Sequence, residues 1–494
     1  MASYGKSGFT RRTVLAGGTA LAAVTSTRPA RAAAAVPGSA APPGRIMTTL
    51  STYMAGAANK PLPPAVAERA KTAILDTLGA IISGADLEPG KVALKFAAAY
   101  RGDNSATIPA SNILCGPIEA ALVNGMLAHS DETDDTHPPS LSHPGAAVVP
   151  AALAVGEKFG SSGERFLRAV ALGYDIGPRF TMMLGARDYM SVAHRSTHAI
   201  SGTFGAAAAA GCMIGLNVQQ MRWLLAYTAE QTSGIASWQR DTQHIWKSFD
   251  FAGMPARNGV TSALLVEAGG TSLDDVFSGA DNFFDAFKPI HPPETVIEAL
   301  GTRYELTRTD IKKWTVGSPI QAPLDALSNL QKKHGFEANA VRGVTVRVAT
   351  HEASVVNNRE IPDISLQHMI AVMLLDKTAS FKAAHDVARM KDPAILRERA
   401  KVRLIGEDSL SAFLPKRVAV VEVTLADGKT VTERVDTVRG TVGNPMPRSE
   451  LIEKARDLIA PALGAAKFQK LSDTIFALET VKSVRELRPL LQKG

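Results

Sequence analysis

The chain has 494 residues, of which 45% are hydrophobic and 20% are charged, and its formal net charge is +7. A chain of this length exceeds one ordinary hydrophobic core and suggests two or three domains. The composition is typical of a globular protein, and the presence of only two cysteines excludes a disulfide framework and a cysteine metal cluster.

The N-terminal segment 1–32 has the features of a twin-arginine signal peptide. Arg11 and Arg12 precede a short apolar run at 16–24, and small residues around Ala32 offer a cleavage site. The run is shorter than the roughly 20 residues that a membrane span needs. We therefore expect the twin-arginine machinery to export the protein to the periplasm or beyond, with no membrane contact after cleavage. Without this basic segment the net charge falls to about +2, so nothing indicates nucleic-acid binding.

Helical periodicity characterises the chain as far as residue 300. Residues 33–45 are rich in Ala, Pro and Gly, which predicts a linker. Beyond this linker, apolar residues recur at helical spacing in seven segments. The predicted helices are 64–85, 117–128, 145–158, 164–183, 202–215, 221–234 and 255–268.

Strand patterns appear only after residue 301. Segment 341–348 alternates as a strand, and segments 418–425 and 430–438 flank an Asp-Gly turn that indicates a hairpin. Helices are expected at 365–375 and 380–390, and again from 449 to the end. We therefore predict a mainly α fold. A large all-helical domain (46–300 and 449–494) is interrupted by a smaller α+β domain (301–448), which we call the lid.

The stretch 128–145 concentrates ionisable side chains between two apolar predicted helices. Desolvating acids and imidazoles is costly, so their placement here indicates a functional site. His143 directly precedes a predicted helix, whose N-terminal dipole favours the neutral imidazole that a general base needs. The stretch predicts an acid/base site, and a metal site is the alternative, although the spacing matches no specific metal motif. The candidate metal ligands are His129, Asp131, Asp135 and His143.

Two further groups lie within the helical region. Arg195 and His198 stand ahead of a small-residue helix, where they suit the binding of an anion. Arg240 and Lys247 are cations in an aromatic, glycine-containing region, which suits carboxylate recognition.

Two other groups lie in the predicted lid or at its border. One of the adjacent lysines Lys312 and Lys313, at the junction between the domains, suits the binding of a carboxylate or the stabilisation of an enolate. His368 follows Ser-Leu-Gln on a predicted helix, and a lone histidine on a helix is more often structural than catalytic.

These blocks, in their order along the chain, resemble the MmgE/PrpD family. The resemblance covers nearly the whole chain after the signal segment. It rests on Leu75-Asp76-Thr77-Leu78-Gly79, Asn124-Gly125 with Ala128-His129, Asp134-Asp135-Thr136 with His143-Pro144-Gly145, Gly202-Thr203-Phe204-Gly205-Ala206-Ala207, Lys247 with Gly253 and Asn258-Gly259, Lys313 with Asp325-Ala326, and Asn444-Pro445.

The resemblance carries expectations of fold and function. The family includes 2-methylcitrate dehydratase, cis-aconitate decarboxylase and iminodisuccinate epimerase. It implies a helical domain with a smaller lid, a homodimer, and neither a metal nor an organic cofactor. It also implies chemistry at the carbon next to a carboxylate in a di- or tricarboxylic acid, which requires a base and cations that hold the developing charge.

Carried over position by position, the active-site positions of the family fall on Thr136, His143 and Lys313. Glu132 stands where decarboxylases have an aspartate, and Lys247 corresponds if one additional residue precedes Gly253. The resulting catalytic candidates are His143, His198, Lys247, Lys313 and His368. The substrate-binding candidates are Glu132, Asp134, Asp135, Thr136, Arg195, Ser196, Arg240 and Gln321.

Three positions depart from the family pattern. The histidine usually found six residues before Gly202 is Ser196 here, the lid tyrosine is His368, and Gln321 occupies a site where many members have histidine. We therefore expect an altered pocket, in which either His198 or His368 works with the base.

The sequence thus predicts a cofactor-independent lyase or isomerase, of the dehydratase, decarboxylase or epimerase type, that abstracts a proton next to a carboxylate. The alternatives are an exported carboxylate-binding protein without catalysis and a metal-dependent hydratase.

Overall fold

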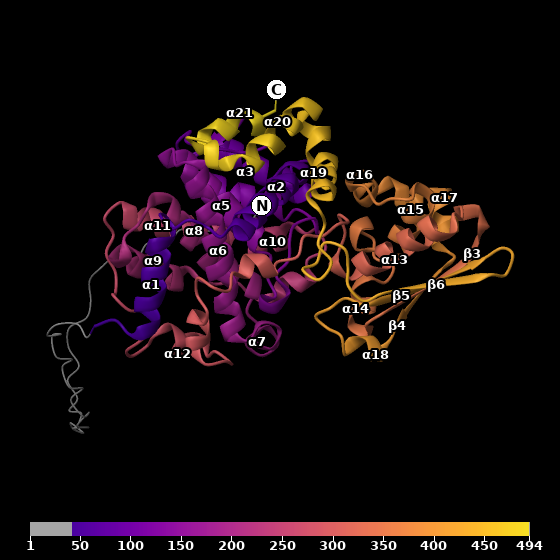
Figure 1. The fold of residues 1–494 in the computed structure, drawn as a ribbon, viewed down its shortest axis with the longest axis horizontal. Helices are drawn as coiled ribbons and strands as arrows, with labels where there is room; N and C mark the ends of the chain where they lie inside the picture. The colour runs from indigo at the N-terminus through magenta and orange to yellow at the C-terminus, as the bar shows by residue number, and fades with distance from the viewer. Residues whose placement is uncertain (1–41, 494) are drawn as a thin grey trace, which may run out of the picture. The chain divides into compact units, whose positions relative to one another are not determined.

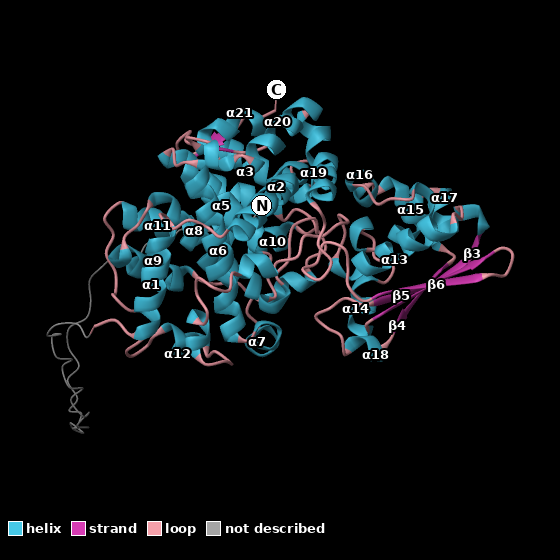
Figure 2. Ribbon diagram, viewed as in Figure 1, coloured by secondary structure: helices cyan, strands magenta, loops and turns pink. Residues whose placement is uncertain are grey.

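The computed structural model describes residues 42–493, so the predicted signal peptide and most of the predicted linker lie outside the described residues. Figures 1 and 2 show a mainly helical chain, which confirms the predicted fold class. The strands form a four-stranded sheet and a separate two-stranded pair, β1 (Ala106–Thr107) with β2 (Leu114–Cys115).

The first hydrophobic core contains the residues up to Leu306 together with the C-terminal helices. All seven helices that periodicity predicts in this region are present, with ends shifted by a few residues. The core helices are α1 (Arg45–Ala57), α2 (Pro64–Gly84), α3 (Glu88–Ala99), α4 (Pro117–Ala128), α5 (Pro144–Phe159), α6 (Gly163–Leu184), α7 (Ala186–Ala193), α8 (Thr197–Ile214), α9 (Val218–Gln231), α11 (Met254–Glu267), α12 (Phe283–Phe287), α19 (Arg448–Leu463), α20 (Ala465–Phe476) and α21 (Arg488–Leu491).

Helix α8 is buried almost along its entire length and packs closely against α6. A Cβ at Gly177 would lie 2.3 Å from the carbonyl oxygen of Ser201, so this crossing requires glycine. The helix begins five residues earlier than predicted, because the Ser196 side chain accepts the backbone N–H of Ala199 and caps its N-terminus.

The second core lies within residues 314–438. Its sheet has the strand order β4-β3-β5-β6, in which β3 pairs with β4 in parallel and with β5 antiparallel. The register sets Val344 opposite Val423 and Val346 opposite Val421, and these buried valines form the core face of the sheet. The elements are α13 (Ser318–His334), β3 (Val341–Val348), α14 (Thr350–Val356), α15 (Leu366–Asp376), α16 (Phe381–His385), α17 (Pro393–Arg399), β4 (Val402–Gly406), α18 (Asp408–Ser411), β5 (Ala419–Leu425) and β6 (Thr430–Val435).

Several elements in this region differ from the sequence prediction or were not predicted from it. The helix expected at 380–390 ends at His385, and a 3₁₀ turn follows at Ala388–Lys391. Strand β4 was not predicted, since it is short and only partly buried and so lacks a clear alternation. The two cores occupy the segments assigned to the helical domain and the lid, while the exact boundaries stay a prediction. No helix within residues 42–493 is long and apolar enough to cross a membrane.

Helix α19 brings the C-terminal part of the chain back onto α2 through a buried ion pair. Lys454 Nζ lies 2.6 Å from Asp76 Oδ1, and it also donates to the carbonyl oxygen of Thr133 at 3.0 Å. Both side chains are at most 5% exposed. One ammonium group therefore ties α2 and α19 to the loop that follows α4.

We expect Lys454→Met to destabilise the protein by about 3–5 kcal/mol, because it leaves the carboxylate of Asp76 buried without its counter-charge. Chemical denaturation of the purified variant measures this loss. The double variant Asp76→Asn/Lys454→Met is expected to recover part of the stability, and equal midpoints for wild type and Lys454→Met would contradict a structural role for the pair.

Candidate active site

The loop between α4 and α5 is held in place by buried carboxylates that form hydrogen bonds with other side chains and with the backbone. Asp135 accepts hydrogen bonds from Tyr174 Oη at 2.5 Å and from the backbone N–H of Gly145 at 3.1 Å. Burial raises the pKa of Asp135 to about 7. His137 is likewise held, with Nδ1 at 2.8 Å from Ser140 Oγ and Nε2 at 3.2 Å from Glu305. Asp135, predicted to bind substrate, instead anchors the loop to α6 and to the start of α5.

Asp134 is the centre of a buried cluster of polar side chains, which also contains His129, His143 and Lys312. Its Oδ2 lies 3.0 Å from His129 Nδ1, and its Oδ1 lies 3.2 Å from His143 Nδ1 and 3.5 Å from Lys312 Nζ. Burial raises the pKa of this carboxyl, but the interactions with His129, His143 and Lys312 outweigh burial and hold the pKa well below its usual range. Asp134 is therefore a carboxylate that orients two imidazoles.

His143 is the imidazole of this cluster that is partly exposed to solvent. Its side chain keeps 10% exposure, whereas those of His129 and Asp134 have none. Burial lowers the pKa of His143 to about 4, against the opposing effect of Asp134. At neutral pH the ring is therefore neutral, with Nδ1–H donating to Asp134 and the Nε2 lone pair 3.5 Å from Thr136 Oγ1. This is the arrangement of a general base with its orienting carboxylate.

An aromatic side chain forms one wall of the cluster. Phe251, in a π-helix at Phe249–Gly253, stacks on His198 with ring centroids 3.7 Å apart and on His129 at 4.6 Å. The centroids of His198 and His143 are 5.4 Å apart. Burial lowers the pKa of His198 well below its ordinary value, so this ring is neutral too. Irregular π-helical turns are frequent at functional sites.

Two lysines converge on Glu132 beside this wall. Lys247, on α10 (Ile245–Ser248), forms an ion pair with the Glu132 carboxylate, and its ammonium lies 5.0 Å from the Phe251 ring centroid. Lys312 donates to the backbone carbonyl of Glu132 at 2.7 Å and lies 3.7 Å from its carboxylate. Burial raises the pKa of Glu132, but the two ammonium groups outweigh burial and hold it well below the usual range. Two cations and a base thus stand within one cluster.

Lys313, predicted as catalytic, points away from this cluster. Its ammonium lies 4.5 Å from the Trp314 ring centroid, and Asp325 and Glu450 are the nearby acids. The structure places the preceding residue, Lys312, in the position expected for Lys313. Sequence could not separate the two, because adjacent lysines in an irregular segment carry no signal of side-chain direction.

The two altered lid positions also lie outside the cluster. Gln321 donates to the carbonyl oxygens of Trp314 and Val316 and accepts from the Trp314 N–H, so it shapes the segment before α13. His368 is fully buried among apolar residues of the second core. Burial lowers its pKa, and the positive charges of Arg399 and Arg389 lower it further, to about 4. Neither residue contacts His143 or the two lysines.

Ser196 caps the beginning of α8, and Arg195 faces a different part of the chain. Ser196 donates to the buried carboxyl of Asp250, which burial brings to a pKa of about 7. The guanidinium of Arg195 lies 4.3 Å from the Phe287 ring centroid and so faces away from the cluster. The predicted anion-binding role of Arg195 therefore finds no geometric support, and Ser196 acts as a cap.

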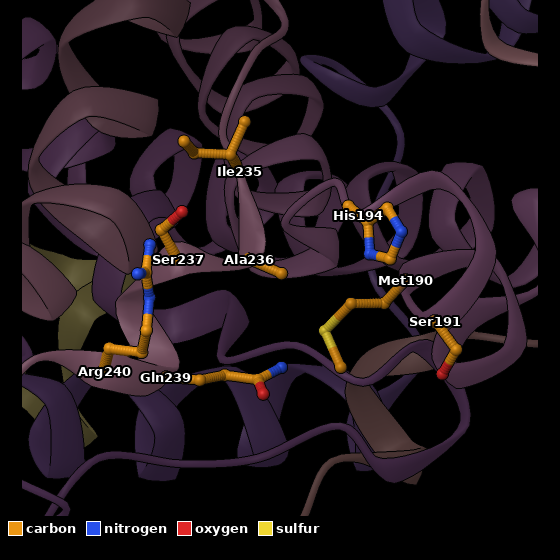
Figure 3. A pocket seen from close by; sticks show the side chains of 8 residues that line it. All are labelled: Met190, Ser191, His194, Ile235, Ala236, Ser237, Gln239 and Arg240. Carbon is orange, nitrogen blue, oxygen red and sulfur yellow. The ribbon is translucent and has the colours of Figure 1, made fainter.

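Arg240 lines a separate pocket of about 560 Å³, shown in Figure 3. One wall comes from segment 190–194, with His194, and the other from segment 235–240. Trp238, in the second segment, contacts the cluster through the Phe251 ring, with centroids 4.6 Å apart. Arg240 is thus a neighbour of the cluster and not a member of it.

Sequence analysis missed His385, which contacts the site loop from α16. Its Nε2 lies 2.8 Å from Asp131 Oδ2, and its Nδ1–H donates to the carbonyl oxygen of Phe381. Burial lowers the pKa of a histidine, but Asp131 outweighs it and raises the pKa of His385 to about 9. An isolated histidine near a helix end gives no sequence signal for such a contact.

We expect His385→Gln to destabilise the protein by roughly 3 kcal/mol below pH 6.5, from 1.36 kcal/mol per pKa unit. A histidine with a raised folded-state pKa contributes stability that is fully present below its unfolded pKa and is lost as pH rises through about 9. The measurement is denaturation of wild type and variant at about pH 6 and about pH 9.5. The difference in free energy of unfolding between wild type and His385→Gln should disappear at the higher pH. A difference that is the same at both pH values would contradict the ion pair.

Two overlapping sets of residues have the composition and spacing for a metal ion. His129, Asp134 and His143 form one set, and His129, Glu132 and His244 form the other, with ligand atoms within 4.8 Å of one another in each. The set predicted from sequence is not assembled, because Asp131 faces His385 and Asp135 faces Tyr174.

Comparison with known proteins shows which family the chain resembles. The model of the MmgE/PrpD N-terminal domain matches residues 48–295, and that of the MmgE/PrpD C-terminal domain matches residues 314–479. A cis-aconitate decarboxylase-like protein of Aspergillus oryzae is 23% identical over 91% of this chain and 98% of its own length. The cis-aconitate decarboxylase of Aspergillus terreus is 24% identical over 90% of this chain and 96% of its own length.

The human cis-aconitate decarboxylase is 27% identical over 86% of this chain and 90% of its own length. Decarboxylases of this kind are carboxy-lyases, which supports the predicted enzyme class. From the matched models and the extent of the relatives, the chain belongs to the MmgE/PrpD family.

Proposed function

We propose that this protein is a lyase that acts, without a metal or organic cofactor, at the carbon next to a carboxylate of a di- or tricarboxylic acid. One observation carries the proposal. A neutral His143, oriented by Asp134, opens beside the two ammonium groups of Lys247 and Lys312. These residues combine a group that can transfer a proton with the positive charge that binding of a polycarboxylate requires.

The roles follow from charge and access. Lys247 and Lys312 bind carboxylates of the substrate and stabilise the negative charge that develops at the reacting carbon. His143 Nε2 faces the substrate and transfers the proton, while Asp134 holds the ring. A bound polycarboxylate adds negative charge beside His143 and raises its pKa, which favours the imidazolium needed to donate a proton.

The same groups serve two related lyase reactions. In a decarboxylation, the bond to the leaving carboxylate breaks, its electron pair stays on the substrate as an enolate-like anion, and His143 protonates the carbon as carbon dioxide departs. In a dehydration, His143 removes the α-proton, and the electron pair of that C–H bond forms the double bond as the C–O bond breaks. The imidazolium then returns the proton to the leaving hydroxyl, which departs as water. Because the relatives are cis-aconitate decarboxylases, we propose decarboxylation of an unsaturated tricarboxylic acid as the first reaction to test.

The departures from the family pattern are compatible with this chemistry. Gln321 and His368 lie outside the cluster, so they leave His143, Asp134 and the two lysines undisturbed. Ser196 caps α8, the helix that carries His198. We therefore propose that these departures leave the basic reaction intact.

The test is an NMR screen of the purified mature protein in heavy water. The panel contains hydroxy, unsaturated and amino di- and tricarboxylic acids, each with and without a chelator. Product formation with deuterium on the carbon next to a carboxylate, unaffected by chelator, supports the proposal. Loss of activity with chelator would show a metal-dependent hydratase. Tight carboxylate binding without turnover across the panel would show a binding protein.

Two further proposals come from the sequence alone. We propose that segment 1–32 directs export by the twin-arginine machinery, and cell fractionation with and without the Arg11–Arg12 pair tests this. We also propose a homodimer, by analogy with the family, and the molar mass in solution tests it.

A further inference from the structure

One side of the cluster contains two buried imidazole nitrogens that the described residues do not satisfy. His129 Nε2 and His244 Nε2 are both buried and lack a hydrogen-bond partner within residues 42–493. Leaving a buried polar atom unsatisfied costs about 1–3 kcal/mol, so two such atoms close together need an explanation. The two rings are neighbours, with centroids 5.1 Å apart.

A carboxylate lies close to both of these histidines. One ring nitrogen from each histidine and a carboxylate oxygen of Glu132 lie within 4.8 Å of one another. Two imidazoles and one carboxylate are borderline ligands that suit Zn²⁺ and similar divalent transition metals. The three residues come from two separate segments, because His129 and Glu132 follow α4 while His244 caps α10.

The surroundings of His129 strengthen this interpretation. Its other nitrogen, Nδ1, lies 3.0 Å from Asp134 Oδ2. A carboxylate behind a histidine fixes the ring so that its second nitrogen presents a lone pair, which is the usual outer-shell arrangement of a metal-binding histidine. His244 is held in position by its left-handed backbone conformation, with φ of 63°.

Lys247 competes for the same carboxylate. Its ammonium pairs with Glu132, and the lysine side chain is 17% exposed, so it has room to leave. A divalent cation bound to Glu132 carries twice the charge of an ammonium group and would repel Lys247. Lys312, which also lies 3.7 Å from this carboxylate, is anchored to the carbonyl oxygen of Glu132, so Lys247 is the lysine that would be displaced.

We propose that His129, Glu132 and His244 bind a divalent transition metal ion such as Zn²⁺, which displaces Lys247 from Glu132 and thereby inhibits the enzyme. The metal-binding part stands on the geometry alone, while the inhibition part rests on the proposed function, in which Lys247 binds the substrate.

The binding test uses Co²⁺ on the purified mature protein, because its visible absorption reports ligation by nitrogen and oxygen. We expect about one Co²⁺ per chain, displaced by Zn²⁺. His244→Asn removes one ligand and keeps a residue that tolerates the left-handed conformation, so Co²⁺ affinity should fall roughly 10- to 100-fold. His351→Asn, at an exposed histidine far from these ligands in sequence, is the matched control and should bind as wild type.

A second variant distinguishes the two possible sets of ligands. His143→Gln should keep the Co²⁺ spectrum, because His143 belongs only to the set with Asp134. A spectrum lost in His143→Gln but kept in His244→Asn would overturn the proposal, as would a wild-type protein that binds no Co²⁺. These readouts need no substrate, so they remain decisive even if the proposed function fails.

The inhibition test compares each protein with its own metal-free activity. Zn²⁺ should remove a much larger fraction of activity from wild type and His351→Asn than from His244→Asn. Equal sensitivity of wild type and His244→Asn, with Co²⁺ binding lost only in the variant, would show that the site binds metal without controlling Lys247 and would overturn the inhibitory role.

Discussion

His143→Gln is expected to lower kcat by about 10²- to 10⁴-fold, the usual contribution of a positioned acid or base. Glutamine can still donate to Asp134, so the loop should remain folded, but it cannot take or give a proton at the position of Nε2. The measurement is the rate of product formation from the acid that the NMR screen identifies, with circular dichroism to confirm folding. His351→Gln, at an exposed position, is the matched control.

The pH dependence gives a second readout of the same prediction. Burial lowers the pKa of His143 to about 4 in the free enzyme, so the neutral base is present at all higher pH values. If the reaction is a dehydration, in which His143 is the base, we expect kcat/KM to show no loss assignable to His143 between neutral pH and about 5, and to fall as pH approaches 4. If it is a decarboxylation, in which the imidazolium donates the proton, we expect kcat/KM to rise as pH falls toward 4. Turnover by His143→Gln at the wild-type rate would eliminate His143 as the proton-transfer group.

Lys312→Met is expected to have a large effect, and Lys313→Met a small one. Loss of Lys312 removes a cation that lies 3.5 Å from Asp134 and 2.7 Å from the carbonyl oxygen of Glu132. Removing one partner of such a buried charge pair costs about 3–5 kcal/mol of stability. Loss of the cation from the developing negative charge should also lower kcat/KM by about 10²- to 10³-fold.

The neighbouring variant Lys313→Met is the matched control for this prediction. Lys313 contacts Trp314 and faces Asp325, so its loss should change kcat/KM less than about threefold, an effect of under 1 kcal/mol. Steady-state kinetics of the two variants decide between the adjacent lysines. The reverse order of effects would return the catalytic role to Lys313 and would remove Lys312 from the site.

The sequence predicted the helical part of the fold well because its signals are local. Apolar residues at helical spacing marked α4 at its observed ends, and alternation marked β3 likewise. The beginning of α8 was misplaced by five residues, since the capping by Ser196 depends on a single side chain. Strand β4 is short and half-exposed, so its pairing with β3 has no counterpart in a sequence pattern.

The candidate site was predictable only as a region. The loop between α4 and α5 stood out because acids and histidines there interrupt buried apolar helices. The role of each carboxylate depends on partners that are distant in sequence. Tyr174 donates a hydrogen bond to Asp135, and His385 pairs with Asp131. Such long-range partners leave no trace in local spacing, and the choice between Lys312 and Lys313 depends on side-chain direction alone.

The most direct test of the central claim is a crystal structure of His143→Gln with the identified acid bound. The account predicts carboxylates of the ligand in contact with Lys247 and Lys312, and the reacting carbon next to the side chain of residue 143. A ligand seated in the pocket of Figure 3, beside Arg240 and His194, with the cluster around Asp134 unchanged, would contradict it.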